Sequence, residues 1–376
     1  MRNKNKKTKV CYILSYRCPN YVRTKTLTCA LKRMDNVVLF EAVNTTKGIF
    51  RYIQTISRLF AIRSTKKPDY YILGFRGYEI FWIVRILTIG KPLILDHMMS
   101  PYDSLISEKK LFKKGRFIER LIYYYEKSIL KYSDIVLTDT VIHRKFFSNL
   151  FKKEEKKIYA VHVGTDEDLF KMIPSGNEVQ KKDLLNVLFY GSFLPLHGIN
   201  IILTVAYLLQ DKPICFTIIG GDGKALRNFN AMKKRLGLNN IIHKKWVPFE
   251  QLPDVIHQAD VCLGGPFGNT GQACRVVTGK TFQSLAMGKT VIVGKIEHDY
   301  GFIDKDNCLL VSQGNERDLA GAILWCFENQ DKLPVIGNKG LDLYRKIFSI
   351  ACIEGILSAL FRKYDLSDEY ETTGEK

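Results

Sequence analysis

The chain has 376 residues, of which 46% are hydrophobic and 25% charged, enough apolar material for two or three folded domains. Nine scattered cysteines without a CxxC pair argue against a disulfide scaffold or a zinc module and favour a reducing compartment. The formal net charge of +19 is uneven, because residues 1–180 carry 34 basic and 17 acidic side chains and residues 181–376 carry 23 and 21. The basic first half therefore predicts an anionic partner, either a membrane surface or a nucleic acid.

The first half alternates short β-rich runs with helical segments. Strands are predicted over 10–15, 37–41, 70–75, 92–96, 135–138 and 158–161, and helices over 23–34, 48–63 and 116–131. These strands are apolar on both faces, which is typical of a parallel sheet covered by helices on both sides. We expect a doubly wound α/β domain. No apolar run reaches the length of about 18 residues that a membrane-spanning helix needs, and the apolar run after the basic N-terminus is too short for a signal peptide.

Polar residues follow the predicted strand 92–96, where Asp96 and His97 precede a turn that contains Asp103. The carboxyl ends of parallel strands line the ligand edge of such a sheet, so these three residues are candidates for catalysis. An equally acceptable interpretation is structural: Asp96 caps the loop and His97 is buried. The histidines show no mutual spacing typical of a metal site.

Two basic segments of the first half combine cations with apolar residues. The helix predicted over 48–63 places Ile49, Ile53 and Phe60 on one face, and the segment 109–120 holds six basic side chains among its apolar ones. Those basic side chains are Lys109, Lys110, Lys113, Lys114, Arg116 and Arg120. Such segments are typical of helices that lie on anionic lipid, although core helices with solvated basic faces have the same pattern. Nucleic acid is not expected as a partner, because no reader motif or stacking platform is evident.

The second half repeats the alternation of strands and helices after a polar joint at 171–184. Strands are predicted over 187–190, 215–219, 241–244, 261–264, 291–294 and 309–311, and helices over 199–209, 224–236, 252–259 and 280–287. This pattern predicts a second doubly wound domain. We place the domains at 1–172 and 173–337. The remaining residues, 338–376, are predicted to form a last helix over 338–363 and a tail.

Glycines follow three of the strands of this second domain. Gly191 and Ser192 end the strand 187–190 and lead through His197 to a predicted helix, and Gly221 and Asp222 stand at the same place after the strand 215–219. A glycine at the carboxyl end of a strand lets a phosphate or a second backbone approach closely. Each turn by itself also fits an ordinary βα connection.

The third loop is the most informative. It is rich in glycine, including Gly268, and leads past Arg275 into a helix whose first turn carries Lys280. A helix N-terminus has free N–H groups and a partial positive charge, so it suits a diphosphate. Gln283 lies one turn after Lys280 and has the chemistry to hydrogen-bond a ribose diol. The alternative is a capped helix with surface Lys and Gln side chains.

The three glycine-rich elements occur in this order in GT-B glycosyltransferases of the family 4 (group 1) type, and four segments of the chain resemble motifs of that family. Residues 280–293 are similar to that family's K-x-x-E-x-x-A-x-G-K-P-V-I helix and strand, and 239–248 to its N-I-x-F-x-G-x-V segment. Residues 259–263 resemble its A-D-V-x-L strand, and 161–170 its V-x-N-G-V-D-x-x-x-F segment. The resemblance covers about 158–330 well and the N-terminal third only loosely. It implies a GT-B fold, with two doubly wound Rossmann-like domains facing a cleft.

The chain departs from the family pattern at four positions. Arg275 and Gln283 stand where the family often has two glutamates, and Ser192 and His197 stand where many members have an arginine and a lysine. An amide binds a diol less strongly than a carboxylate does. We expect Arg275 and Lys280 to supply the missing positive charge.

The resemblance also implies roles for the candidate residues. The donor, a nucleotide sugar, would contact Gly191, Ser192, His197, Gly221, Asp222, Val247, Gly268, Arg275, Lys280 and Gln283. His97 would contact the sugar or its phosphate, and Asp96 or Asp103 would orient the acceptor. The last helix would pack back on the N-terminal domain, as in the family.

By this resemblance, the expected reaction is metal-independent glycosyl transfer without a cofactor and with retention of configuration. The expected donor is a nucleotide sugar, and the expected acceptor is a lipid-linked or cell-surface glycan in polysaccharide biosynthesis. The expected location is the cytoplasm, peripherally bound to the inner face of the plasma membrane. Two alternatives stay open. One is a GT-B epimerase or phosphorylase, and the other is a non-catalytic GT-B subunit of a glycan-assembly complex, which the absent glutamate pair makes plausible.

Overall fold

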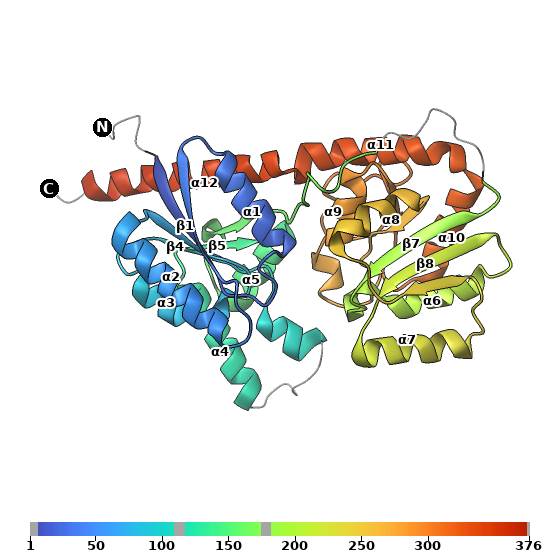
Figure 1. Ribbon diagram of the computed structural model, residues 1–376, viewed down its shortest axis with the longest axis horizontal. Helices are drawn as coiled ribbons and strands as arrows, with labels where there is room; N and C mark the ends of the chain where they lie inside the picture. Colours follow the sequence, from blue (N-terminus) through green and yellow to red (C-terminus); the bar gives the residue numbers. More distant parts are fainter. Residues whose placement is uncertain (1–6, 109–116, 174–181, 374–376) are drawn as a thin grey trace. The chain divides into compact units, whose positions relative to one another are not determined.

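The computed structural model describes residues 7–108, 117–173 and 182–373, with side chains at 7–106, 117–173 and 182–364. The chain divides into two compact units (Figure 1), of which the first comprises Met1–Gly164 with Ile350–Lys376 and the second comprises Thr165–Ser349. The boundaries thus lie at 164/165 and 349/350 rather than at the expected 172/173 and 337/338. Most of the expected joint, 174–181, lies outside the described residues, as do Lys109, Lys110, Lys113, Lys114 and Arg116.

The first unit is built on a parallel six-stranded sheet in the order β2-β1-β3-β4-β5-β6. Its strands are β1 (Thr8–Leu14), β2 (Val37–Val43), β3 (Tyr70–Leu73), β4 (Leu93–Asp96), β5 (Ile135–Thr138) and β6 (Ile158–Ala160). Its helices are α1 (Val22–Arg33), α2 (Phe50–Lys66), α3 (Phe81–Leu87), α4 (Phe117–Tyr132), α5 (Val141–Phe151) and α12 (Ile350–Thr373). All six predicted strands are confirmed, and so are the three helices predicted among them.

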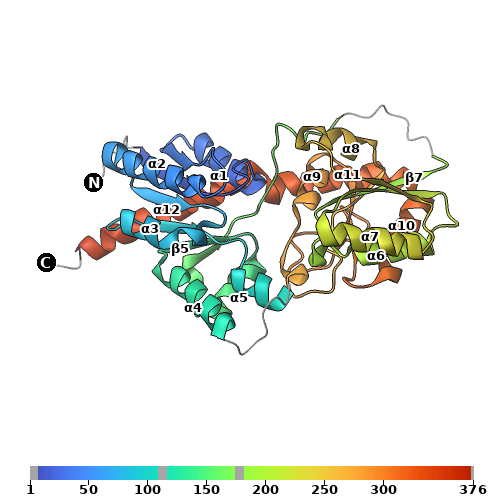
Figure 2. The ribbon, with the colours of Figure 1, turned by 60° about the horizontal axis from the view of Figure 1, so that its bottom comes forward.

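Both faces of this sheet are covered, which explains why its strands are apolar on both sides. On one face, Leu27 of α1 and Leu357 of α12 are fully buried in a core with Val10 and Tyr12 of β1. On the other face, helices α2 to α5 pack over a second core (Figure 2). The alternation of side chains along β1, with Val10 and Tyr12 in one core and Cys11 in the other, follows directly from the two-residue period of a strand.

The second unit contains a second parallel six-stranded sheet, in the order β12-β11-β10-β7-β8-β9. Its strands are β7 (Leu185–Gly191), β8 (Ile214–Gly220), β9 (Ile241–Lys244), β10 (Val261–Leu263), β11 (Thr290–Gly294) and β12 (Leu309–Val311). Its helices are α6 (Ile199–Leu208), α7 (Gly223–Arg235), α8 (Leu252–Gln258), α9 (Gly279–Ala286), α10 (Glu316–Glu328) and α11 (Leu333–Leu343). The doubly wound α/β architecture predicted for this half is confirmed.

The prediction of one continuous helix over 338–363 is wrong. The helix α11 ends at Leu343, a wide helical turn covers Tyr344–Phe348, and α12 begins at Ile350. Ser349 has extended backbone angles, φ −66° and ψ 162°, and its hydroxyl donates to the carbonyl of Arg345 at 2.8 Å. The break between the two helices therefore lies at Ser349, and its side chain bonds to a carbonyl of the preceding turn.

Helix α12 belongs to the first unit. Ile353, Leu357 and Leu360 recur at helical spacing and are completely buried. The helix packs against α1, which is inclined to it in Figure 1. Within the described ranges, no helix has the length and apolar content needed to cross a bilayer.

Candidate functional site

The glycines predicted to mark a ligand edge lie at the carboxyl ends of neighbouring strands of the second sheet. Gly191 ends β7 and is paired with Gly220 at the end of β8. A Cβ atom on Gly220 would lie 2.0 Å from the carbonyl oxygen of Gly191, so only glycine permits this approach. The next residue, Gly221, has φ +87°, and a Cβ there would lie 2.4 Å from the ring of Phe193. The glycines therefore let the backbones at the ends of β7 and β8 come close together and leave them uncovered by side chains of their own.

The loop that follows β7 packs directly on the loop that follows β10. The Gly268 N–H donates to the Leu196 carbonyl at 2.9 Å, and a Cβ on Gly268 would lie 2.2 Å from the Pro195 carbonyl oxygen. On the other loop, Gly198 has φ +66°, and a Cβ there would lie 2.8 Å from the backbone nitrogen of Gly268. This brings two of the predicted glycine-rich loops into one site.

Lys280 and His197 meet above Gly191. A Cβ on Gly191 would lie 3.4 Å from Lys280 Nζ and 3.3 Å from His197 Cε1. The ammonium also lies 5.3 Å from the centroid of the Phe189 ring, a cation–π distance. Helix α9 and the loop after β7 thus place two basic side chains at the end of one strand.

Both basic side chains, Lys280 and His197, are largely shielded from water. Burial lowers the pKa of Lys280 to about 7, because the ammonium loses water. Burial, together with the neighbouring Lys280, holds the pKa of His197 well below its usual range. In the described parts of the chain, no carboxylate pairs with Lys280, and His197 Nδ1 is buried without a hydrogen-bond partner. The cluster therefore suits an anionic ligand that would replace the lost hydration.

The N-terminus of α9 adds a second feature that suits an anion. Thr278 precedes the helix, but its hydroxyl donates to the Gly264 carbonyl at 2.5 Å instead of capping the helix. Gly279, the first helical residue, has nothing within 4 Å of the place where a Cβ would lie. The first turn of α9 therefore opens on free space beside Lys280, and its N–H groups favour negative charge.

The other donor residues predicted in this domain take varied positions. Gln283 is buried, and its Oε1 accepts a hydrogen bond of 2.8 Å from the hydroxyl of Tyr190. The Arg275 guanidinium lies beside Gly271, with Nη1 3.2 Å from the position of a Cβ there. Ser192, Asp222 and Val247 follow the ends of β7, β8 and β9, with Asp222 exposed. The predicted residues thus gather at one sheet edge, and the described contacts do not join Arg275 to Lys280.

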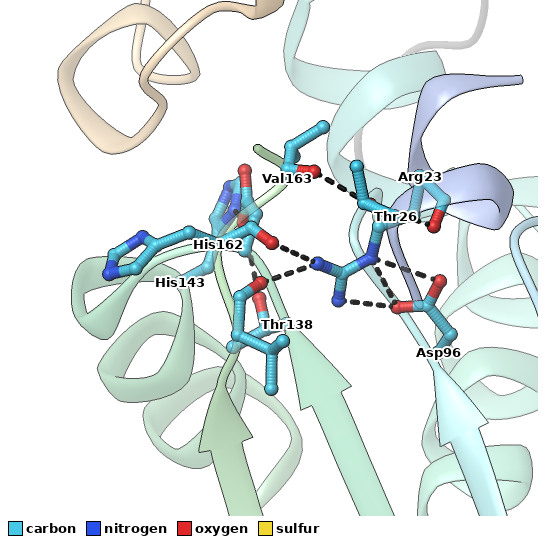
Figure 3. A network of polar contacts seen from close by, with 9 residues as sticks. Arg23, Thr26, Asp96, Thr138, His143, His162 and Val163 are labelled. Carbon is cyan, nitrogen blue, oxygen red and sulfur yellow. Dashed lines mark hydrogen bonds and ion pairs between the residues drawn. The ribbon is translucent and has the colours of Figure 1, made fainter. Parts of the chain in front are cut away.

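In the first unit, Asp96 ends β4 and is buried against Arg23 of α1 (Figure 3). The Arg23 Nη2 and Nε atoms donate to Asp96 Oδ1 at 2.8 and 3.1 Å, and Nε also donates to Oδ2 at 3.2 Å. Arg23 Nη1 donates to the carbonyls of Val161 and His162. Both carboxylate oxygens of Asp96 are therefore engaged by one fully buried guanidinium.

His97 is held by a partner that the sequence did not reveal. Its Nε2 lies 2.8 Å from Oε1 of the buried Glu126 in α4, and Oε2 of Glu126 accepts the Tyr102 N–H at 2.8 Å. The backbone N–H of Asp103 donates to the Ser100 hydroxyl at 3.0 Å. A single carboxylate thus fixes both the imidazole and the turn that follows it.

A second buried carboxylate–imidazole pair follows β5. His143 Nδ1 lies 2.6 Å from Asp139 Oδ1, and burial, which would raise the pKa of Asp139, is outweighed by His143 and Arg23, which hold that pKa low. The His97 and His143 rings both contact Phe147, at centroid distances of 5.1 and 5.4 Å. Asp139 directly follows the predicted strand 135–138, just as His97 follows 92–96, and this position is the sequence signal that could have identified it.

Comparison with known proteins supports the glycosyltransferase resemblance. Residues 185–329 match the family model "Glycosyl transferases group 1". A protein from Klebsiella pneumoniae, described as an uncharacterized 41.2 kDa protein in the cps region, is 23% identical over 222 residues. That alignment covers 57% of this chain and 59% of the relative, so it spans less than two thirds of the relative's length.

Solved structures share the fold of almost the whole chain. The crystal structure of HepE from Anabaena in complex with UDP has a TM-score of 0.70 at 12% identity, and covers 95% of this chain and 100% of that one. Sucrose-phosphate synthase from Thermosynechococcus elongatus has a TM-score of 0.71 at 15% identity, and covers 96% and 100%. The two parallel sheets with their helices are therefore the GT-B fold, as predicted.

Proposed function

We propose that this GT-B protein is a glycosyltransferase that takes its sugar from a nucleoside diphosphate sugar. The observation that carries the proposal is the meeting of Lys280 and His197 above Gly191, at the open N-terminus of α9. All three lie inside the segment that matches the family model. The crystal structure of HepE holds UDP, which favours a uridine diphosphate among the possible donors.

In the proposed reaction the cleaved bond joins the sugar to the diphosphate, so negative charge grows on the leaving phosphate. Lys280 and the N–H groups of the first turn of α9 would stabilise that charge. His197, whose pKa is low, would act as a neutral hydrogen-bond partner of a phosphate or sugar oxygen. We propose that these groups take the part that a divalent metal plays elsewhere, and that the reaction retains the anomeric configuration, as the resemblance implies.

The proposed acceptor is a lipid-linked or cell-surface glycan, bound by the first unit. Support comes from the relative in the cps region and from the polar groups at the ends of β4 and β5. His97, oriented by Glu126, and Asp103 are the proposed acceptor-side residues, and Asp96 is proposed to act through Arg23 as a positioning residue. Cytoplasmic polysaccharide synthesis beside a membrane is part of the same proposal.

A binding experiment tests the donor site directly. Calorimetric titration with UDP, GDP and CMP, and with their sugars, should show one base bound best by the full chain. Charged hydrogen bonds contribute about 1.5–3 kcal/mol, so Lys280→Ala should weaken binding about 10- to 100-fold. Lys234→Ala is the matched control, because Lys234 is an exposed lysine in the last turn of α7 of the same unit.

Unchanged affinity in Lys280→Ala would remove this lysine from the site. The non-catalytic alternative is favoured by Arg275 and Gln283, which stand in place of the glutamate pair. It predicts donor binding without turnover when suitable glycan acceptors are supplied. Release of nucleoside diphosphate that depends on the acceptor would decide for the enzyme.

A further inference from the structure

Exposed apolar side chains are concentrated on three helices of the first unit. Among the described residues, 24 large hydrophobic side chains are exposed, and 14 of them lie between residues 49 and 132, on or beside α2, α3 and α4. They are Ile49, Phe50, Ile53, Phe60, Trp82, Ile83, Ile86, Ile89, Phe117, Ile118, Leu121, Tyr124, Tyr125 and Tyr132. We name this set the α2–α4 surface. Scattered exposed apolar residues need no explanation, but a group of this size on one side of a domain does.

The three helices lie side by side on one face of the sheet (Figure 1). The Arg63 guanidinium of α2 donates to the Ile89 carbonyl beyond α3 at 3.3 Å, and the rings of Trp82 in α3 and Tyr132 in α4 lie 5.2 Å apart. Their inward faces are fixed by buried residues such as Leu59 and Val84. The outward faces of the three helices therefore form one continuous side of the unit.

The apolar residues occupy those outward faces by helical geometry. In α2, Ile53 and Phe60 are 61% exposed, on a different side of the helix from the buried Leu59. In α3, Ile83 and Ile86 are exposed whereas Val84 is buried, and Leu121 of α4 is exposed in the same way. Each helix packs one apolar face on the sheet and exposes a second one to water. The exposed apolar face indicates a second contact, in addition to the domain core.

The charge of the same helices is almost all of one sign. Together, α2, α3 and α4 carry eight lysines and arginines and two acidic residues. One of the two, Glu126, is buried with His97, and the other, Glu119, accepts a hydrogen bond from Tyr102. Arg120 and Lys131 are exposed on the outward side of α4. Arg51 of α2 and Arg85 of α3 pair with Glu79 and Asp134, which lie outside the three helices. Apolar side chains interleaved with the exposed cations that remain complement an anionic lipid surface.

We propose that the α2–α4 surface docks on an anionic bilayer, with its apolar and aromatic side chains entering the headgroup region and its cations contacting lipid phosphates. A second copy of the chain fits less well, because a two-fold interface would bring these like charges together. Aromatic side chains such as Trp82 and Tyr124 suit the interface between lipid and water. Membrane docking would bring the enzyme close to the lipid-linked acceptor of the proposed function. The docking proposal itself rests only on the α2–α4 surface.

The test is sedimentation of the full chain with vesicles. The wild type should bind vesicles of phosphatidylcholine with phosphatidylglycerol and not vesicles of phosphatidylcholine alone. A basic residue near an anionic surface contributes about fivefold to binding, so Arg120→Glu/Lys131→Glu should lose at least about 25-fold. Ile83→Ser/Ile86→Ser/Leu121→Ser should lose the fraction that stays bound in high salt.

Matched controls are available on the second unit. Lys224→Glu/Lys234→Glu reverses two exposed charges of α7, and Leu208→Ser/Ile303→Ser/Val335→Ser removes three side chains that are 51–57% exposed. Both controls should bind like the wild type. In a Trp246→Phe/Trp325→Phe background, Trp82 is the remaining tryptophan, and its emission should shift to the blue with anionic vesicles.

The outcomes separate this proposal from its competitors. No binding to anionic vesicles at low salt, or equal loss in the controls, would overturn it. A dimer that the Ile83, Ile86 and Leu121 substitutions dissociate, without vesicle binding by the wild type, would assign the surface to a second copy. Since donor binding is measured separately by calorimetry, intact nucleotide binding without vesicle binding would reject this proposal and leave the proposed function standing.

Discussion

Lys280 combines a full positive charge with deep burial and lacks a carboxylate partner in the described part of the second unit. Burial therefore lowers its pKa to about 7, so the free protein holds this side chain partly neutral near physiological pH. A bound diphosphate would favour the ammonium form and raise the pKa again. The site would then take up a proton when the donor binds.

This coupling predicts that nucleotide affinity falls as pH rises above 7. Below pH 7 the free protein already carries the proton, whereas above it binding must recruit one, at up to about tenfold in affinity per pH unit. The terminal phosphate, with a second pKa of about 6, is ionised throughout this window. Calorimetry with UDP at pH 7, 8 and 9, in buffers of different ionisation enthalpy, measures both the affinity and the proton uptake.

Lys280→Arg is the matched control, because a guanidinium stays charged throughout this pH range. The slope should disappear in that variant even if its affinity is lower. A wild-type affinity that does not change between pH 7 and 9 would show that Lys280 does not gain a proton on binding.

Arg23 and Asp96 form a buried ion pair whose stability cost can be measured. Arg23→Met should lower the free energy of unfolding of the first unit by about 3–5 kcal/mol, because it leaves the Asp96 carboxylate buried without a partner. Arg23→Met/Asp96→Leu should recover most of that loss. Urea unfolding followed by Trp82 fluorescence, with Trp246 and Trp325 replaced by phenylalanine, reports on this unit. Additive losses in the double variant would refute the pairing.

Contacts between side chains that are far apart in the sequence could not be predicted from the sequence. Asp96 and His97 were predicted because they stand at the carboxyl end of a strand. Arg23 and Glu126, which hold them, lie 73 and 29 residues away. No local pattern encodes such a contact, and an arginine in an amphipathic helix ordinarily suggests a solvated face. Gln283 was predicted to face a ribose, and nothing in its helix indicated that its oxygen would accept from Tyr190.

At the scale of the element, helix α9 offers a glycine that separates binding from folding. Gly279 is its first residue and has open space where a Cβ would lie, so Gly279→Ala should leave the stability of the second unit unchanged or slightly higher. The added methyl group would stand where a phosphate approaches the first turn. Nucleotide binding should therefore weaken, as calorimetry and thermal unfolding measure together.

The glycine at the end of β8 provides the contrast. Gly220→Ala would place a Cβ 2.0 Å from the Gly191 carbonyl at φ +118°, so it should destabilise the second unit itself. If Gly279→Ala binds nucleotide as the wild type does, the N-terminus of α9 is not part of the donor site.

The strands could be predicted because the pattern that identifies each one lies within a few consecutive residues. Each strand of both sheets is a short apolar run between polar or glycine-rich turns, and all twelve predicted runs are strands of the described residues. The last helix was mispredicted because the apolar period continues through the break at Ser349. Periodicity reports which side chains are buried, and both α11 and α12 bury theirs, although in different units.

For the molecule as a whole, the proposed chemistry predicts that activity survives chelation of metals. Two Asp-x-Asp pairs occur, at 166/168 and 304/306, but no group of three or more metal-ligating side chains is assembled among the described residues. Asp306 pairs with Lys339, and Asp304 accepts the Leu310 N–H at 2.9 Å. Transfer measured with EDTA should equal transfer without it. A loss that Mg²⁺ or Mn²⁺ restores would contradict the proposed role of Lys280.

The return of α12 to the first unit has a consequence for biosynthesis. All residues of the second unit leave the ribosome before Ile353, Leu357 and Leu360, which complete the core around α1 of the first unit. Until then, the N-terminal sheet has α1 on that face but lacks the part of its cover that α12 supplies. The second unit therefore has all of its residues available for folding before the first unit does. Over that interval the nascent chain presents the kind of uncovered apolar surface that chaperones recognise.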